Sequence, residues 1–351
     1  MINSCLYVIS RFGTKNKGGV ERVADLLVRS LCEKYTRVEI LSEECVMPGF
    51  LKNGRLSLFL FPFFASIYLW FQRIRRRDFQ TISNGYQAAF YPADVVIMHG
   101  SAAAYVQAMK GRTGRMLGMR VTGWMEVIAM RLAHKIICVS DDLFDYVTTV
   151  QGINTAKCEV AYNGVVTEYS DVSDTVRLRD GEPIRLGFAG RLEYGKGVGY
   201  LLALAKCLVN RTDICLKIAA LGEVPADLEN RAEVKIFRGI SADDMPVFYS
   251  QIDIFILPTL FEGFELVTLE AIAAGVPVLG RRIGACGLLL KRSVPWVGVL
   301  PETAEELLKQ LPNFSSKFRA RLDSSVMRRY VLDNFSIVDF CKKIEETLKR
   351  D

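Results

Sequence analysis

One segment in the second half of the chain has the pattern of a strand, a helix and a second strand, and it constrains the fold more than any other part. The first apolar run, Ile252–Leu257, is short, rich in branched and aromatic residues, and stopped by Pro258, as in a buried parallel strand. Apolar residues then recur at helical spacing until Gly275 and Pro277 end the helix, and a second strand, Val276–Leu279, overlaps this stop. Parallel strands joined by helices predict an α/β fold.

The same alternation of strands and helices runs through all 351 residues, and a chain of that length usually forms two domains. We expect the first domain to span residues 1–170 and the second residues 184–335, with the polar stretch 170–183 as the linker. A last amphipathic helix, Ile337–Lys349, forms most of a third segment, residues 336–351. The prediction is two Rossmann-like domains whose parallel sheets face a central cleft.

The loop and first helical turn after the strand that ends before Pro258 have the features of an anion-binding site. In open parallel sheets, ligands collect beyond the carboxyl ends of the strands, where helix N-termini present free N–H groups and positive dipole ends. The amides of Glu265, Leu266 and Val267 fall in this first turn, so they lack acceptors within the helix and can hold a diphosphate. Gly263 precedes them and allows a close approach of the backbone.

Two glutamates frame this loop. Glu262 stands in the loop itself, where its carboxylate would face a sugar. Glu270 lies eight positions later, one turn beyond Leu266 on the same helix face, where a carboxylate can accept hydrogen bonds from two ribose hydroxyls. Solvated glutamates near a helix start are the alternative, because the helix dipole favours them. The spacing of the pair, within a frame of Pro, Gly and Phe, favours a nucleotide-sugar site.

A second glycine-rich turn carries two cations. It follows the apolar strand Ile184–Phe188 and holds Arg191 and Lys196 before a helix that begins near Val198. In a site without a metal, two cations can neutralise the charge on a departing nucleoside diphosphate, Arg through a planar fork and Lys as a point charge. Ordinary surface basicity is the alternative for either residue taken alone.

Two further features of the first domain lie at the ends of predicted strands. Gly18 and Gly19 follow the strand Leu6–Ser10 and precede a helix, so the backbone can pass close to a phosphate or a sugar, although a plain turn explains the pair equally well. They do not fit G-x-G-x-x-G, which argues against a dehydrogenase. His99 follows the strand Val95–Met98, and its ring can project into the cleft; a purely structural role is the alternative.

These motifs resemble the retaining glycosyltransferases of family 4, which have the GT-B fold. The E-x7-E signature of that family is matched at Glu262, Gly263, Phe264, Leu266, Val267, Glu270, Ala271, Gly275 and Pro277. The turn with Arg191 and Lys196 is similar to the family's phosphate-binding loop, and Gly18 with Gly19 is similar to its donor-contacting glycine loop. One residue departs from the pattern, because the family usually has a second glycine where this chain has Glu265. A charged side chain near the donor pocket would narrow the choice of sugar.

The resemblance implies roles for several of the matched residues. The donor would be bound by the loop and first helical turn that hold Gly263, Phe264, Glu265, Leu266 and Val267. Glu262 would position the donor sugar, Glu270 would bind the ribose, and His99 would lie near the transferred sugar. Arg191 and Lys196 would stabilise the leaving group together with the helix amides. Retention implies a front-face route in which the leaving phosphate helps to deprotonate the incoming hydroxyl. The last helix resembles the family's closing helix, which crosses back to the first domain.

Cysteines and histidines give no sign of a metal or disulfide framework. The nine cysteines are irregularly spaced without a C-x-x-C pair, which fits free thiols in a reducing cytoplasm. With two histidines and no clustered cysteines we expect no metal site, and because the nucleotide sugar is a substrate we expect no cofactor. Arg11 and Gly13 interrupt the first apolar run, so we expect no cleavable signal.

The first domain has a strongly basic stretch, residues 51–140. Within it, Leu56–Phe71 is apolar and aromatic but split by Pro62 and short for a membrane span. We expect a core element whose end dips into a bilayer, since Trp70 and Trp124 near arginines suit an anionic membrane interface. A buried strand and helix packed on the first sheet are the alternative. No nucleic-acid motif accompanies the basic stretch, so a nucleic-acid partner is not expected.

The predicted function is that of a retaining, metal-independent transferase. It would move a hexose-type sugar from a nucleoside diphosphate sugar, UDP favoured over GDP, to a hydroxyl of a lipid-linked glycan or lipopolysaccharide-type acceptor. It would act in the cytoplasm, peripherally at the inner face of the membrane. A nucleotide-sugar epimerase of the same fold is one alternative, but it would need more carboxylates and histidines. A non-enzymatic glycan- or lipid-binding protein is the other, and it would not need both cations and both glutamates.

Overall fold

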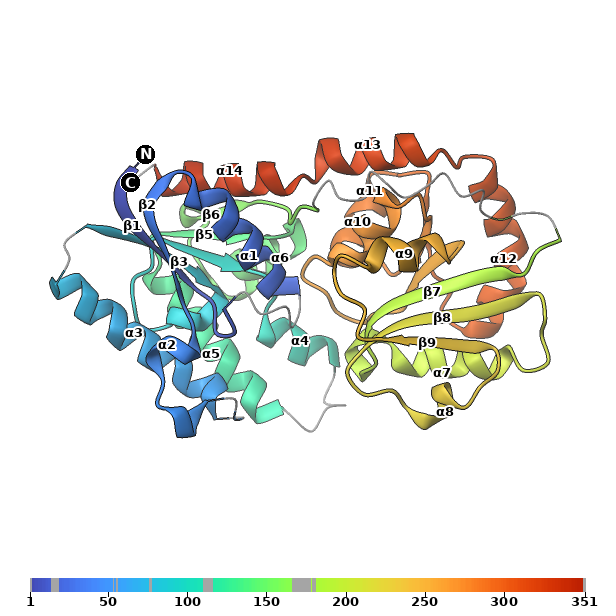
Figure 1. Cartoon of the computed structure of the whole chain (residues 1–351), viewed down its shortest axis with the longest axis horizontal. Helices are drawn as coiled ribbons and strands as arrows, with labels where there is room; N and C mark the ends of the chain where they lie inside the picture. The colour runs from blue at the N-terminus through green and yellow to red at the C-terminus, as the bar shows by residue number, and fades with distance from the viewer. Residues whose placement is uncertain are drawn as a thin grey trace. The chain divides into compact units, whose positions relative to one another are not determined.

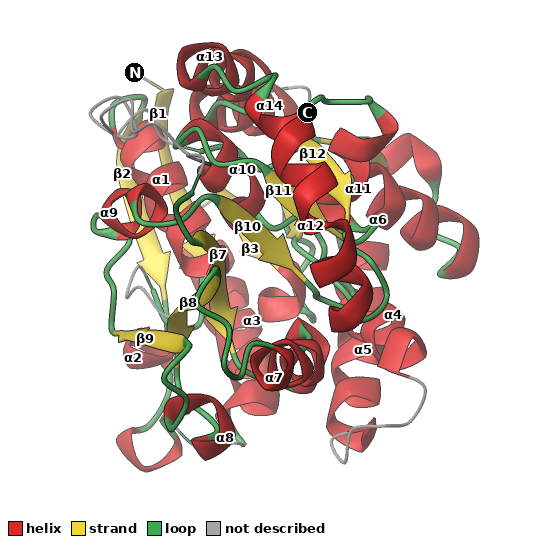
Figure 2. Ribbon diagram, turned by 90° about the vertical axis from the view of Figure 1, so that its right-hand side faces the viewer, coloured by secondary structure: helices red, strands yellow, loops and turns green. Residues whose placement is uncertain are grey.

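The chain forms two compact units, Met1–Gly164 with Ile337–Asp351, and Val165–Ser336. Each unit has a parallel sheet with helices on both faces, as Figures 1 and 2 show, which confirms the predicted α/β class. Most of the stretch expected to be the linker lies outside the described residues. The computed structural model describes residues 2–13, 19–52, 54, 56–75, 78–109, 116–165, 178 and 181–349.

The sheet of the first unit has six strands in the order β2-β1-β3-β4-β5-β6. The strands are β1 (Ile2–Ile9), β2 (Tyr35–Leu41), β3 (Phe79–Asn84), β4 (Val95–Met98), β5 (Lys135–Cys138) and β6 (Cys158–Val160). All pairs are parallel. The strand order reverses between β1 and β3, so the loops that leave their carboxyl ends diverge, which is where α/β sheets bind ligands.

Helices cover both faces of the first sheet. They are α1 (Gly19–Cys32), α2 (Glu43–Val46), α3 (Ser57–Arg75), α4 (Ala102–Met109), α5 (Met116–Leu132), α6 (Asp141–Asp145) and α14 (Ile337–Leu348), with short 3-10 turns at Gly49–Leu51, Gly85–Ala88 and Thr155–Lys157. A π-helical turn, Tyr146–Val150, continues α6. Ser140 caps α6, because its side chain accepts a hydrogen bond from the Leu143 amide at 3.2 Å.

Helix α3 covers most of the apolar stretch and differs from the alternative of a strand followed by a helix. It is one helix of 19 residues with Pro62 inside it, not a strand followed by a helix. Phe61, Ala65 and Leu69 are fully buried and pack in a cluster that includes Tyr7. By length and composition alone α3 could cross a membrane, a test that the core helix of a soluble protein also passes.

The last helix, α14, belongs to the first unit. Lys34 of the first unit pairs with Glu345, and Lys343 pairs with Glu159 on β6. Gln80 of β3 donates to the carbonyl of Leu348 at 2.9 Å. These polar contacts surround an apolar helix face that is buried against the sheet.

The sheet of the second unit has the order β12-β11-β10-β7-β8-β9, again with parallel pairs. The strands are β7 (Ile184–Arg191), β8 (Ile214–Leu221), β9 (Val234–Arg238), β10 (Ile254–Leu257), β11 (Val278–Gly280) and β12 (Val297–Val299). The helices are α7 (Val198–Cys207), α8 (Ala226–Glu229), α9 (Met245–Ser250), α10 (Leu266–Ala273), α11 (Gly284–Lys291), α12 (Ala304–Arg319) and α13 (Ser324–Asn334), with a 3-10 turn at Tyr194–Lys196. The order reverses between β7 and β10, as in a dinucleotide-binding sheet.

A buried ion pair holds β7 and β10 in register. Asp253, at the start of β10, accepts hydrogen bonds from the amide and the guanidinium of Arg185 on β7, at 2.7–2.8 Å. The pKa of Asp253 is lowered although burial opposes the shift, because Arg185 donates to the carboxylate. Two strands that are far apart in sequence are thereby fixed side by side, with their carboxyl-terminal loops at one edge of the sheet.

All nine cysteines are free. Cys138, Cys158, Cys286 and Cys341 are buried, while Cys32 and Cys45 are exposed. Four of the nine thiols are therefore buried.

Candidate functional site

The loops after β7 and β10 meet at the point where the strand order of the second sheet reverses. The Leu260 amide donates to the carbonyl of Gly195 at 2.8 Å, and the Thr259 hydroxyl donates to the same carbonyl at 3.0 Å. Gly197 has φ +82°, and a Cβ atom there would lie 2.4 Å from the carbonyl oxygen of Pro258. Only glycine fits this contact, so Gly197 sets how closely the two loops approach.

The two loops bring Lys196 and Glu262 together. The Lys196 ammonium forms an ion pair with Glu262 Oε1, and both side chains are largely buried, at 26% and 14% exposure. The Thr259 hydroxyl also lies 3.3 Å from Glu262 Oε1. Lys196 and Glu262, which were predicted from separate motifs, therefore form one cluster. A ligand with a phosphate and a sugar would need such a cation and carboxylate close together.

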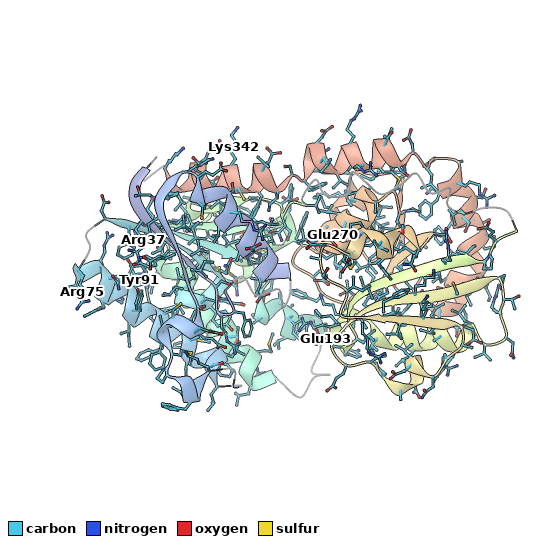
Figure 3. All side chains as sticks on the ribbon, in the orientation of Figure 1. Arg37, Arg75, Tyr91, Glu193, Glu270 and Lys342 are labelled. Carbon is cyan, nitrogen blue, oxygen red and sulfur yellow. The ribbon has the colours of Figure 1, made fainter. Side chains whose placement is uncertain are left out.

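Arg191 lies at the end of β7 and forms an ion pair with Glu193 rather than with Glu262. Its guanidinium is 3.2 Å from Glu193 Oε1, and its side chain is 60% exposed. Figure 3 labels Glu193, in the loop that leads to the turn with Lys196. Arg191 and Lys196 thus flank one loop as predicted, with Arg191 on the more exposed side.

The N-terminus of α10 has no side-chain cap. Glu265 occupies the N-cap position, but its side chain makes no cap hydrogen bond. Leu266 and Val267 begin the helix, where amides have no acceptor within the helix, and both residues are partly exposed. Phe264 has a different environment from the one expected of a donor contact, because its ring is buried and lies 5.9 Å from the ring of Phe335.

The Glu265 side chain binds the start of another helix. Its carboxylate accepts from the amides of Ala285 and Cys286 at 2.9 and 2.7 Å and from the Thr268 hydroxyl at 2.9 Å. Burial, followed by the charge of Glu262, raises the pKa of Glu265 to about 7. A Cβ atom on Gly284 would lie 2.1 Å from Glu265 Oε2, so this close packing also requires glycine.

Glu270 is fixed inside the second unit. It is 3% exposed, and its Oε2 accepts a hydrogen bond from the Tyr249 hydroxyl at 3.1 Å. Figure 3 labels Glu270 on α10, among the helices that cover the sheet. Tyr249 orients this carboxylate from α9, a contact that the E-x7-E spacing alone does not reveal.

His99 lies in the first unit at the carboxyl edge of the sheet. Its Nε2 is 3.0 Å from Asn84 Oδ1 at the end of β3, and Asn84 Nδ2 donates to the Ile9 carbonyl at the end of β1. Burial lowers the pKa of His99 to about 4, so the ring is neutral at pH 7. Gly19 begins α1 with open space around its Cα, while Gly18 lies outside the described residues.

Comparisons with known proteins match both units. Residues 17–169 match the family described as "Glycosyltransferase Family 4", and residues 183–314 match "Glycosyl transferases group 1". The chain belongs to the family 4 glycosyltransferases. A sucrose-phosphate synthase from Thermosynechococcus elongatus has the same fold, with TM-score 0.76, 16% identity and 98% coverage of each chain. The GT-B expectation for the fold is therefore confirmed.

Sequence relatives of this family 4 chain match it over part of their length. An uncharacterized glycosyltransferase of Methanocaldococcus jannaschii is 27% identical over 52% of the chain and 51% of its own length. A UDP-Gal:alpha-D-GlcNAc-diphosphoundecaprenol alpha-1,3-galactosyltransferase of Escherichia coli is 21% identical over 64% of the chain and 62% of its own length. The chain thus spans about half the length of the first relative and less than two thirds of the second.

Several residues of this family 4 chain that shape the site were not predicted. Gly197, Tyr249 and Thr259 position Lys196, Glu270 and Glu262 from elements that only the fold brings close. The segment around Gly284 lacks the usual acidic residue of the family, so the family's contacts could not be transferred to it. In the sequence, the glycine itself was the one indication of a close contact in this segment. In the structure, Gly284 has φ +56° and faces the carboxylate of Glu265. Among the described residues, no group of three His, Cys, Asp or Glu side chains gathers as a metal site would need.

Proposed function

We propose that the protein transfers a hexose-type sugar from a nucleoside diphosphate sugar to an acceptor hydroxyl, with retention of the anomeric configuration and without a metal. The observation that carries the proposal is the cluster at the strand-order reversal of the second sheet. There, Lys196 and Glu262 come from loops after β7 and β10 and lie in contact. The uncapped start of α10 follows Glu262 within the same loop.

Each side chain of the cluster has a proposed task. Lys196 and the first amides of α10 bind the diphosphate, which competes with Glu262 for the ammonium, and Arg191 adds charge from the exposed side. Glu262, released from Lys196, accepts from hydroxyls of the sugar, and Glu270 accepts from the ribose. His99, neutral at pH 7, is proposed to hydrogen-bond the transferred sugar.

The proposed reaction breaks the bond between the anomeric carbon and the phosphate oxygen. The acceptor oxygen forms its bond on the same face of the sugar, and its proton passes to the leaving phosphate oxygen. Positive charge from Lys196, Arg191 and the helix dipole offsets the charge that develops on the diphosphate, which is the task a metal would otherwise perform.

The proposed donor carries UDP rather than GDP, and the proposed acceptor is a lipid-linked glycan or lipopolysaccharide-type glycan. The Escherichia coli relative, whose name gives a UDP-sugar and a diphosphoundecaprenol acceptor, supports both choices. We also propose that the first unit binds peripherally to the inner, cytoplasmic face of a membrane. Helix α3 exposes Phe63, Ile67, Trp70, Phe71 and Ile74, each 48–80% exposed, on one side.

Incubation with UDP-, GDP- and ADP-sugars, with and without a lipid-linked glycan, tests the proposal by mass spectrometry. We expect glycan extension and UDP release that persist in EDTA. The variant Lys196→Ala should reduce kcat/KM at least a hundredfold because it removes a charge that acts on the leaving group. Lys206→Ala, a change of an exposed lysine on α7, is the matched control and should keep full activity.

The same assay distinguishes the alternatives. Isomerisation of the donor sugar without transfer would identify an epimerase. If no sugar nucleotide is consumed and the protein only binds glycan or lipid, the transferase proposal fails.

A further inference from the structure

One side-chain amide joins three strand ends of the first unit. Strand β3 lies between β1 and β4 in the sheet, and Asn84 is its last residue. The Asn84 Nδ2 atom donates to the carbonyl of Ile9 on β1 at 3.2 Å, and its Oδ1 atom lies 3.0 Å from His99 Nε2, just after β4. Asn84 is 3% exposed, so these two contacts satisfy both ends of a buried amide.

The Ile9 carbonyl decides which way round this amide lies. A carbonyl oxygen can only accept a hydrogen bond, so Asn84 must turn its NH2 group toward Ile9 and its oxygen toward His99. Asn84 also precedes the 3-10 turn Gly85–Ala88, but its side chain makes no cap hydrogen bond there. The Ser83 hydroxyl accepts from the Ala88 amide at 3.1 Å instead. The Asn84 side chain is therefore available to link the neighbouring strands.

The orientation of the amide determines where the His99 ring carries its proton. An amide oxygen cannot donate, so His99 Nε2 must donate to Asn84 Oδ1. Because burial lowers the pKa of His99 to about 4, the ring is neutral at pH 7 and has one N–H group. Within the part of the chain that the structure describes, Asn84 is the one hydrogen-bond partner of the ring, and His99 is partly exposed. Its Nδ1 atom is therefore left as an acceptor.

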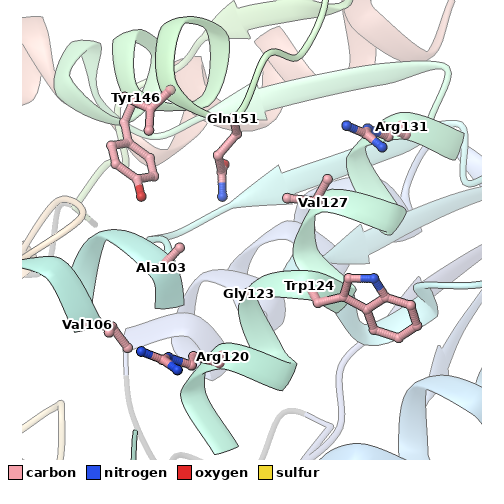
Figure 4. A pocket seen from close by; sticks show the side chains of 10 residues that line it. Ala103, Val106, Arg120, Gly123, Trp124, Val127, Arg131, Tyr146 and Gln151 are labelled. Atoms are coloured by element: carbon pink, nitrogen blue, oxygen red, sulfur yellow. The ribbon is translucent and has the colours of Figure 1, made fainter. Parts of the chain in front are cut away.

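The loop after His99 is held by α5. Glu126 on α5 accepts from the amide of Ala102, the first residue of α4, at 2.9 and 3.1 Å. A Cβ atom on Gly123 would lie 3.4 Å from the Ala103 amide nitrogen, so a glycine on α5 lets α4 approach closely. Figure 4 labels Ala103 and Gly123 at a groove that these two helices enclose. The backbone next to His99 is thus fixed by α5, and the ring is fixed by Asn84.

We infer that Asn84 is a positioning residue that holds His99 with its proton on Nε2, so that Nδ1 accepts a hydrogen bond from a hydroxyl of the transferred sugar. The presence of a sugar rests on the proposed function. The inference adds chemical selectivity to it, because a nitrogen with a lone pair and no proton accepts from a hydroxyl but does not bind a phosphate or carboxylate oxygen. A contact between His99 and the diphosphate would need a proton on Nδ1.

Long-range proton–nitrogen NMR of the free protein reads the tautomer once the histidine nitrogens are isotopically labelled. The chain has two histidines, so His134→Gln leaves His99 as the one labelled side chain. At pH 7 we expect a single tautomer with the proton on Nε2. Asn84→Leu keeps a similar size without the amide and should give a mixture of both tautomers.

The matched control for Asn84→Leu is Asn334→Leu, which removes an exposed amide that also donates to a backbone carbonyl, that of Tyr330. It should leave the pattern of the His99 nitrogens unchanged. A proton on Nδ1 in the unaltered protein would overturn the inference, and so would an Asn84→Leu pattern identical to that of the unaltered protein.

Titration with UDP-glucose, UDP-galactose and GDP-mannose tests the sugar contact. We expect a sugar nucleotide that binds to shift the Nδ1 resonance of His99, and UDP or GDP alone to leave it in place. The amide of His99→Asn reaches about as far as Nδ1, so the Kd of the sugar nucleotide should rise less than about threefold. The amide of His99→Gln extends to the position of Nε2, and the Kd should rise at least about tenfold.

Equal losses in His99→Asn and His99→Gln, or a bound sugar nucleotide that leaves the Nδ1 resonance in place, would overturn the sugar contact. If none of the sugar nucleotides binds, the proposed function fails and the sugar contact fails with it. The spectra of the free protein decide the tautomer separately, because they require neither ligand nor turnover.

Discussion

At the residue scale, the position that decides most about the candidate donor site is a glycine. Gly197 has φ +82°, and it brings the turn with Lys196 within contact of the Pro258 carbonyl. An ordinary side chain would be strained there whatever its chemistry, because both the backbone angle and the space exclude it. The position of the Lys196 ammonium therefore depends on Gly197, which carries no charge.

We predict that Gly197→Ala lowers the free energy of unfolding by about 2–4 kcal/mol, from left-handed strain together with the clash. UDP affinity should fall at least tenfold because the loop that holds Lys196 must shift. Thermal unfolding and calorimetric UDP binding measure the two effects. Gly199→Ala is the control, since a Cβ atom there meets nothing within 4 Å and the helix gains about 0.5–1 kcal/mol. Equal behaviour of the two variants would contradict the assigned role.

His99 gives a prediction about pH at the same scale. Its pKa is lowered by burial to about 4 from 6.5, so the folded state disfavours the proton that the unfolded state binds. The stability that its neutral ring contributes is complete above about pH 6.5 and is lost as the pH falls toward 4. Between pH 6.5 and 4, the free energy of unfolding measured in urea should fall by about 2 kcal/mol less in His99→Gln than in the unaltered protein.

The exposed His134 provides the control for this measurement. His134→Gln should leave the free energy of unfolding within about 0.5 kcal/mol of the unaltered protein. If the pH profile of stability is the same for His99→Gln and the unaltered protein, burial does not lower the pKa of His99 in solution.

At the element scale, the link between α10 and α11 is made by one carboxylate. Glu265 caps the start of α11 through the amides of Ala285 and Cys286, although it belongs to the loop before α10. The family usually has glycine at this place, which has no side chain to make such a link. Its effect is to fix the loop that contains Glu262 against the start of a second helix.

Glu265→Ala should lower the free energy of unfolding by about 2–3 kcal/mol, because two buried amides lose their acceptor. Glu302→Ala, which removes a glutamate that is 81% exposed and pairs at 3.6 Å, should cost less than about 0.5 kcal/mol. Chemical denaturation at constant pH compares the two. A loss for Glu265→Ala no larger than that of the control would mean that water replaces the carboxylate at no cost.

Helix α3 has one buried side and one exposed side. One side is buried in the aromatic cluster of the first unit, while the other exposes apolar side chains and ends in arginines. The sequence shows an apolar stretch but does not reveal which residues face inward. Only packing against the sheet separates Phe61 and Leu69 from the exposed Ile67 and Ile74.

At the scale of the whole molecule, this exposed face predicts salt-dependent membrane binding. The protein has a formal net charge of +6, and we expect it to sediment with anionic vesicles at low salt and to be released at high salt. Ile67→Glu/Ile74→Glu should reduce the bound fraction severalfold by removing apolar contact.

The control for vesicle binding is Val326→Glu, on an exposed position of α13 in the other unit. It should sediment like the unaltered protein. If the unaltered protein stays in the supernatant with anionic vesicles at low salt, peripheral membrane binding is excluded and the acceptor must be delivered in another way.

Local pattern in the sequence determined the α/β class, several of the strands and helices, and the segments that carry Arg191, Lys196, Glu262 and Glu270. Apolar periodicity and turn residues report on neighbours a few positions away, so they are sufficient for elements and their ends. Tertiary structure alone decided that β7 lies beside β10, that Lys196 pairs with Glu262, that Glu265 caps α11, and that α4 and α5 enclose a groove. Each of these contacts joins residues far apart in the chain. Burial and packing of the whole unit decide which residues meet, and the spacing of residues in the sequence does not predict this.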